Sequence, residues 1–174
     1  ALRFLLETAN RVHFVDPHFR AAENRFRASM KEFLRIACAS SFYRMGAASV
    51  FLHVTYDHTP PMDENVKLRR IELLKGDVSS RVPSLLPAGC TMHVHVWNRL
   101  DDNENFHNRY ILTDRAGVLF GTGLDTNEQG NQTDDICRLT ADQYAHRMAL
   151  YGVDSAGFSP SFEKIAQMVV IGTG

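Results

Sequence analysis

The chain has 174 residues, of which 44% are hydrophobic and 22% are charged, and its formal net charge is −1. This composition excludes a disordered chain, and the length suits one domain, so we expect a single domain over residues 1–174 that could be excised from a larger protein. The small net charge excludes a general attraction to nucleic acid or anionic lipid, although it allows a local basic groove. No apolar run approaches the ~20 residues of a membrane span and no signal peptide is visible, so no transmembrane segment is expected.

Helical and strand patterns alternate along the first third of the chain. Leucines at helical spacing predict a short helix at the start, and Val12–Val15 predicts a strand that stops at Asp16-Pro17 because proline has no amide hydrogen. An apolar stripe between Ala22 and Ala37 predicts the next helix, in which Glu23 and Arg27 are spaced as an i,i+4 ion pair. The first strand therefore ends in a corner that leads toward a helix.

The next segments of the chain continue the alternation of strands and helices. Residues 49–56 predict a second strand, and a helix is expected from about Asp63 to Lys75, with Gly76 as its C-terminal cap. A short helix or turn is expected between Pro83 and Pro87. This order is typical of an α/β domain.

The third predicted strand, residues 91–97, carries a His-x-His pair. Alternation places His93, His95 and Trp97 on one face of that strand. Such a pair can bind a metal ion, but no third ligand stands at a suitable spacing. Packed or hydrogen-bonded histidines are therefore expected, and no metal ion or other cofactor.

Residues 106–125 hold the most informative pattern in the chain. His107 and Arg109 are two residues apart, so in a strand their side chains share a face. Asp114 stands where that strand ends, and residues 118–120 read as the return strand. Gly121 and Gly123 then allow the backbone to approach a ligand closely.

The last part of the chain predicts a loop, a strand and two helices. Residues 126–135 contain no hydrophobic side chain, so they are either a lid over the glycine segment or an ordinary surface loop. A short strand at 136–139 is followed by a helix to about Leu150. Phe162, Ile165 and Val169 then suggest one side of a final helix that begins near Ser159-Pro160.

Three cysteines, Cys38, Cys90 and Cys137, lie far apart in the sequence. None forms a Cys-x-x-Cys pair, and each falls in an apolar-looking segment. Buried thiols in a reducing compartment are expected, which favours a cytoplasmic location.

The 106–125 pattern resembles the motif of the phospholipase D superfamily, which is His-x-Lys-x4-Asp followed after six residues by Gly-Ser-x-Asn. His107, Asp114 and Gly121 match at the same spacing. Arg109 stands at the lysine position and Leu124 at the asparagine position, with Asp125 one place later. The resemblance implies a phospholipase-D-like layered α/β fold, with a mixed β-sheet flanked by helices.

A second resemblance shares more details. The Asp16-Pro17 corner, the His107-x-Arg109 strand and the segment Gly121–Asp125 are similar to those of the phospholipase-D-like domain that follows a microtubule-interacting-and-trafficking domain in a eukaryotic abscission protein. That relative is regarded as a membrane binder without hydrolytic activity, but the present chain keeps Asp114.

The resemblance to the phospholipase D superfamily implies phosphodiester cleavage if the site is active. His107 would attack phosphorus and become a phosphohistidine, Arg109 would neutralise the phosphoryl oxygens, and Asp114 would orient the site or hold the imidazole tautomer. The remaining candidates would bind substrate, namely Gly121, Thr122, Gly123, Asp125, Asp16 and His18. For Asp16 the alternative is that it simply caps the helix after the corner.

The partner of such a site is a phosphodiester or another phosphate-bearing ligand, either nucleic acid or a phospholipid headgroup. Hydrolysis needs a second acid, and a chain with one motif copy would obtain it by forming a homodimer or from a second histidine, with His18, His58 and His93 as candidates. One alternative is an inactive module that binds phosphate without cleaving it. Another is an interaction domain whose motif residues only stabilise the fold.

Overall fold

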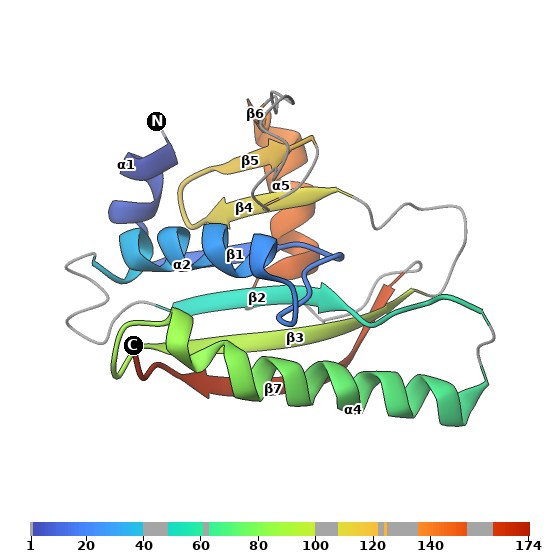
Figure 1. Cartoon of the computed structure of the whole chain (residues 1–174). Helices are drawn as coiled ribbons and strands as arrows, with labels where there is room; N and C mark the ends of the chain where they lie inside the picture. The colour runs from blue at the N-terminus through green and yellow to red at the C-terminus, as the bar shows by residue number, and fades with distance from the viewer. Residues whose placement is uncertain are drawn as a thin grey trace.

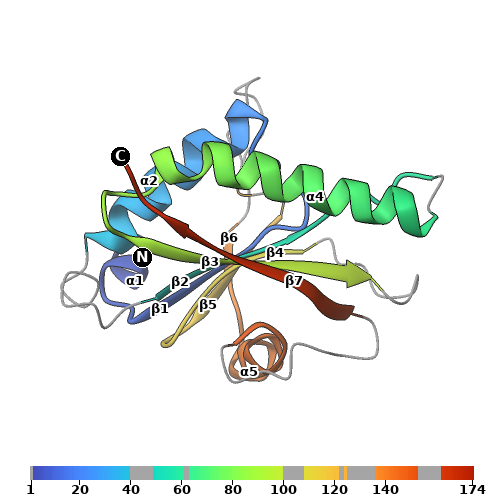
Figure 2. The ribbon, with the colours of Figure 1, turned by 90° about the horizontal axis from the view of Figure 1, so that it is seen from below.

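The structure of the chain, a computed structural model, describes residues 2–39, 49–60, 63–99, 108–121, 124, 136–152 and 162–174. These residues form a seven-stranded mixed sheet with helices on both faces, as Figures 1 and 2 show. The predicted α/β class is therefore confirmed.

The strands are β1 (Arg11–Val15), β2 (Ser49–Thr55), β3 (Thr91–Arg99), β4 (Arg109–Thr113), β5 (Gly117–Phe120), β6 (Ile136–Arg138) and β7 (Phe162–Ile171). The helices are α1 (Leu2–Glu7), α2 (Asn24–Cys38), α4 (Glu64–Arg81) and α5 (Ala141–Tyr151), with a 3-10 turn, η1 (Pro83–Leu85), after α4. None of these helices is both long and apolar enough to cross a membrane.

The strand order is β6-β5-β4-β1-β2-β3-β7. β1, β2 and β3 are parallel, and the chain crosses between them through α2 and α4, which lie on the same side of the sheet (Figure 2). β4, β5 and β6 are successively antiparallel and are joined to this unit by the antiparallel pairing of β4 with β1. We call the two sides of the sheet the α2/α4 face and the α5 face.

The main core lies on the α2/α4 face. Phe14, Leu52, Val94 and Ile111 come from four adjacent strands and are all 0% exposed. The predicted stripe of α2 packs onto them through apolar residues that recur every three or four positions, the buried Phe26, Met30, Leu34 and Ala37 and the partly buried Phe33. The strand residues that face α2 and the apolar stripe of α2 thus form one continuous buried core.

A smaller core lies on the α5 face. Trp97, Tyr110 and Leu112 are buried there against Leu150 and Tyr151 of α5. The start of α5 is fixed by a capping box, in which the Thr140 and Gln143 side chains each accept a hydrogen bond from the other residue's backbone amide.

The predicted end of α4 at Gly76 is wrong, because the helix continues to Arg81. Glycine in a helix interior costs about 0.5–1 kcal/mol relative to alanine. Val78 is buried in the next turn, and its packing against the sheet compensates for this cost.

The predicted final helix is also wrong, because residues 162–171 form β7, which pairs antiparallel with β3. The apolar spacing of Phe162, Ile165 and Val169 fits a helix, but the edge of β3 offers a row of unpaired backbone groups. Pairing satisfies these groups, and it buries Phe162 and Val170. The proposed start at Ser159-Pro160 lies outside the described residues.

Two side-chain expectations also differ from the structure. Glu23 pairs with Arg25 at 2.8 Å, whereas Arg27 donates to the backbone oxygens of Ala21 and Ala22, so the predicted Glu23–Arg27 pair is absent from the described ion pairs. Cys38 is buried as expected, but Cys137 is exposed because β6 is an edge strand of three residues.

Candidate functional site

The candidate site lies where β1 ends and β4 begins. These strands are antiparallel with Val15 opposite Tyr110, so the next positions, Asp16 and Arg109, also face each other. Phe14 and Ile111 belong to the core of the α2/α4 face, and alternation therefore directs Asp16 and Arg109 to that same face. A carboxylate and a guanidinium meet at this end of the sheet.

Asp16 and Arg109 form an ion pair with 3.7 Å between Asp16 Oδ1 and Arg109 Nε. The Asp16 side chain is 0% exposed and that of Arg109 is 19% exposed, so the pair is largely removed from water. Asp16 Oδ1 also accepts a hydrogen bond of 3.0 Å from the backbone amide of His18. The alternative that Asp16 caps the next helix is wrong, because α2 begins only at Asn24.

The guanidinium of Arg109 is oriented by its Nε end. Its terminal nitrogens, Nη1 and Nη2, make no hydrogen bond to any residue in the described part of the chain, and Nε itself makes only the ion pair. A guanidinium held in this way presents two parallel N–H donors, the geometry that binds two oxygens of one phosphate or carboxylate.

The return strand brings Gly121 to the same end of the sheet. Phe120 pairs with Arg109, so Gly121 follows opposite residue 108. Leu124, which stands at the family's asparagine position, is 2% exposed and packs in the main core, and its carbonyl accepts a hydrogen bond from Ser29 of α2. Leu124 is thus a core residue rather than a ligand-binding one.

Four predicted site residues lie outside the described residues, namely His107, Thr122, Gly123 and Asp125. The expected convergence of His107 with Arg109 therefore stays a prediction. The proposed lid at 126–135 also lies outside them.

Asp114 is at the opposite end of β4 from Arg109. Five residues of extended strand separate the two by about 17 Å. Asp114 Oδ1 accepts hydrogen bonds from the backbone amides of Asn10 and Arg11, at 2.9 and 3.3 Å, and Oδ2 accepts one from the Asn10 side chain at 3.2 Å. The expectation that Asp114 orients the catalytic site is corrected, since its carboxylate fixes the entry into β1.

Arg20 was not predicted as part of the site, yet it fixes the corner after β1. Its Nη1 nitrogen donates to the backbone oxygens of Pro17, Phe19 and Thr55, at 3.3, 2.9 and 3.1 Å. The Thr55 hydroxyl adds a hydrogen bond of 2.8 Å to the Pro17 oxygen. The sequence gives no signal for this role, because the acceptors are backbone atoms.

The predicted histidine ladder is confirmed and is larger than expected. On the α5 face, Phe51 stacks against His93 and His13 with ring centroids 5.1 and 4.5 Å apart. His53 contacts His95 edge-on at 5.0 Å. No group of three metal-ligating side chains was found among the residues that the structure describes. His93 lies in this ladder, which excludes it from the Arg109 end of the sheet.

No protein-family model matches the chain, and no significant relative was found among curated proteins.

Proposed function

We propose that the chain is a phosphodiesterase with a phospholipase-D-like fold, whose active site is formed by His107, Arg109 and the segment from Gly121 to Asp125. The observation that carries this proposal is the orientation of Arg109, whose Nε faces buried Asp16 while Nη1 and Nη2 make no hydrogen bond to a described residue. A guanidinium whose Nε faces a buried carboxylate can present its two terminal N–H groups to a phosphoryl group.

In the proposed reaction the imidazole of His107 attacks phosphorus, and the bond from phosphorus to the leaving oxygen breaks. An acid protonates that oxygen, and water then hydrolyses the phosphohistidine to release the second product. Arg109 binds two non-bridging oxygens throughout, and its charge offsets the negative charge that grows on them in the transition state.

The acid is proposed to come from a second copy of the chain in a homodimer. The candidate within the chain is His18, which is half-buried at the same corner as Asp16 and donates its amide to that carboxylate. The contact of the His18 amide with Asp16 supports His18, rather than His93, as this candidate.

The ion pair with Asp16 also favours a second function, phosphate binding without hydrolysis. Asp16 lowers the net charge that Arg109 offers to an anion, which suits reversible binding of a phosphodiester or of a lipid headgroup. Since the net charge of the chain is −1, recognition of nucleic acid or of a lipid surface would depend on this local site.

The test is turnover of bis(4-nitrophenyl) phosphate, followed by an alkaline quench with a phosphorus-labelled substrate. We expect release of nitrophenol, label trapped on His107 and loss of both in His107→Ala. His146→Ala, at an exposed position on α5, is the matched control and should retain activity. Turnover that survives His107→Ala rejects the histidine nucleophile, and binding of dimethyl phosphate without any turnover selects the second function.

A further inference from the structure

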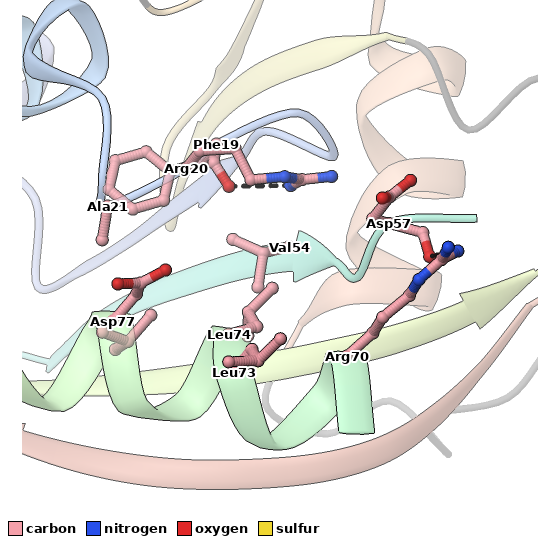
Figure 3. A pocket seen from close by; sticks show the side chains of 10 residues that line it. Phe19, Arg20, Ala21, Val54, Asp57, Arg70, Leu73, Leu74 and Asp77 are labelled. Atoms are coloured by element: carbon pink, nitrogen blue, oxygen red, sulfur yellow. Dashed lines mark hydrogen bonds between the residues drawn. The ribbon is translucent and has the colours of Figure 1, made fainter. Parts of the chain in front are cut away.

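A pocket of about 240 Å³ lies between α4 and the segment 19–21 that leads into α2 (Figure 3). Its walls come from three parts of the chain that are distant in sequence, and ten residues line it: Phe19, Arg20, Ala21, Val54, Asp57, Arg70, Leu73, Leu74, Asp77 and Val78. The volume equals that of about eight water molecules, which is room for one ring with a small substituent.

The middle of the pocket is apolar. Phe19, Val54 and Val78 are almost fully buried, and they form the inner wall. Leu73 lines the pocket from α4 and is 61% exposed, although leucine at a helix position near the sheet normally buries its side chain. An apolar ligand in the pocket would cover Leu73.

The charged residues of the pocket are divided between its ends. Figure 3 shows the Arg20 guanidinium on the side of Asp57 and Arg70, with Asp77 at the other end. Arg70 and Asp77 are seven residues apart on α4, or about 10 Å along the helix axis. One end is therefore basic, and the other end is acidic.

Among the described residues, Arg20 has no direct ionic partner. Its hydrogen bonds to described residues run from Nη1 to neutral backbone oxygens, and it takes part in none of the ion pairs between these residues. Burial lowers the pKa of the Arg20 guanidinium, and the more distant Asp57, Asp16 and Glu23 only partly offset this effect. An anion beside Arg20 would compensate the buried charge.

The other charged side chains of the pocket have local contacts. Asp57 Oδ1 accepts hydrogen bonds from the amide and the hydroxyl of Thr59. Arg70 donates to the backbone oxygens of Asp57 and Thr59, and Asp77 pairs with Arg81 at 3.5 Å. These contacts fix the positions of the charged side chains and do not fill the pocket.

We propose that this pocket binds a small ligand with one anionic group and an apolar body, the anionic group beside Arg20 and the body against Leu73 and Leu74. The acidic end at Asp77 excludes a ligand that carries a second anionic group about 10 Å from the first. A carboxylate or a phosphate monoester meets this description. The site does not depend on the proposed phosphodiesterase activity, because it uses neither His107 nor Arg109.

The proposal is tested by calorimetric titration of the protein with phenylacetate and with phenyl phosphate. Acetate lacks the apolar body, and 1,4-phenylenediacetate carries a second charge at the far end. Both should bind at least ~10-fold more weakly than phenylacetate, whose own affinity is in the range typical of fragments. Preference for phenyl phosphate over phenylacetate would identify the anionic group as a phosphate.

Two tryptophan substitutions on α4 provide a matched pair. Leu73→Trp fills the pocket and should weaken phenylacetate binding at least ~10-fold, whereas Leu68→Trp, at a position that is 53% exposed and does not line the pocket, should leave it unchanged. Arg20→Met should also weaken binding.

Absence of phenylacetate binding in the unmodified protein would overturn the proposal. Equal effects of Leu73→Trp and Leu68→Trp, or equal binding of acetate and phenylacetate, would also overturn it. Because Leu73 and Leu68 are both exposed, the comparison stands even if Arg20→Met does not fold. A protein that binds phenylacetate but hydrolyses no phosphodiester would retain this inference and reject the proposed catalysis.

Discussion

His13 Nδ1 and His53 Nε2 lie 3.0 Å apart in the interior of the protein, and Trp97 donates its indole hydrogen to His53 Nδ1 at 3.0 Å. Since an indole nitrogen can only donate, His53 must accept through Nδ1 and carry its own hydrogen on Nε2. His13 then accepts through Nδ1. The chain of hydrogen bonds requires both imidazoles to be neutral, because a proton on either ring would place two N–H groups against each other.

The free energy of unfolding should therefore depend on pH. Burial, and to a smaller degree His95 and Arg11, lowers the pKa of His13 to about 3, and burial also holds the pKa of His53 well below its ordinary value. Below pH 6.5 the unfolded chain binds protons that the folded one does not, so stability is full above that pH and falls as the pH drops toward 3. Each histidine contributes a slope of up to about 1.4 kcal/mol per pH unit, measurable by urea unfolding at several pH values.

The matched variants are His13→Asn and His146→Asn. Asparagine at position 13 can accept from His53 through its oxygen but cannot bind a proton, so the slope of stability against pH should decrease. His146 is exposed on α5, and its replacement should leave the slope as it is. Equal slopes in all three proteins would show that the buried pair does not control the acid sensitivity.

Asp114 is expected to act on stability and not on the phosphoryl site. Its three hydrogen bonds to Asn10 and Arg11 are lost in Asp114→Ala, which should cost about 1–2 kcal/mol of unfolding free energy. Asp114→Asn keeps one acceptor and should cost less. Phosphate affinity, measured by titration at a temperature where both variants are folded, should equal that of the unmodified protein. A weaker phosphate affinity in Asp114→Asn would show that Asp114 contributes to phosphate binding.

Arg109→Lys separates three roles for the guanidinium. If Arg109 binds two oxygens of the scissile phosphate, lysine loses one of the two contacts, which costs about 1–3 kcal/mol and lowers turnover ~10-fold or more. If the chain is a decayed hydrolase, lysine should raise turnover. If Arg109 only pairs with Asp16, the variant changes the melting temperature and leaves phosphate affinity unaltered. Turnover, phosphate affinity and melting temperature of this one variant separate these outcomes, of which the first is expected.

Two glycines should respond in opposite directions to alanine. A Cβ atom at Gly172 would overlap the backbone oxygens of Pro87 and Leu86, which the turn after β7 cannot move easily, so Gly172→Ala should cost on the order of 3 kcal/mol. Gly76 has no neighbouring atom within 4 Å of such a Cβ, and Gly76→Ala in the interior of α4 should stabilise the protein by about 0.5–1 kcal/mol. Urea unfolding of both variants measures the two effects, and a destabilising Gly76→Ala would contradict the packing described for α4.

A homodimer is expected in solution if the second acid comes from another copy. Light scattering across a range of concentrations measures the mass directly. A monomer with full activity would reject the shared site, and loss of that activity in His18→Gln would then assign the acid to His18 at the Asp16 corner.

The elements with a clear period were predictable from the sequence, and those decided by distant contacts were not. The alternation of Met92, Val94 and Val96 against His93, His95 and Trp97 fixed the faces of β3. Residues 162–171 form a strand only because β3 has an open edge, which no local pattern reveals. In α4, the buried side chain of Val78 outweighs the local preference of Gly76 to end a helix.

Only part of the candidate site was predictable from the sequence. The proline after the first predicted strand marked the Asp16 corner. The family resemblance marked Arg109, which forms an ion pair with Asp16 in the structure. The resemblance assigned the wrong role to Asp114, since a motif in sequence order gives no indication that its last member is at the other end of the strand. His13 and His53 were not identified as a pair because they are 40 residues apart and meet only when β1 and β2 align.

The position of β1 between β2 and β4 has a consequence for how the chain folds. Its two neighbours in the sheet come from segments about 40 and 100 residues further along, so β1 pairs with β4 only after most of the chain is available. Loops of this length close slowly, and they give a high contact order. The parallel unit β1-β2-β3 can form during synthesis, but Asp16 and Arg109 meet only when β4 docks. The proposed phosphoryl site should therefore appear late in refolding, after the helix signal has recovered.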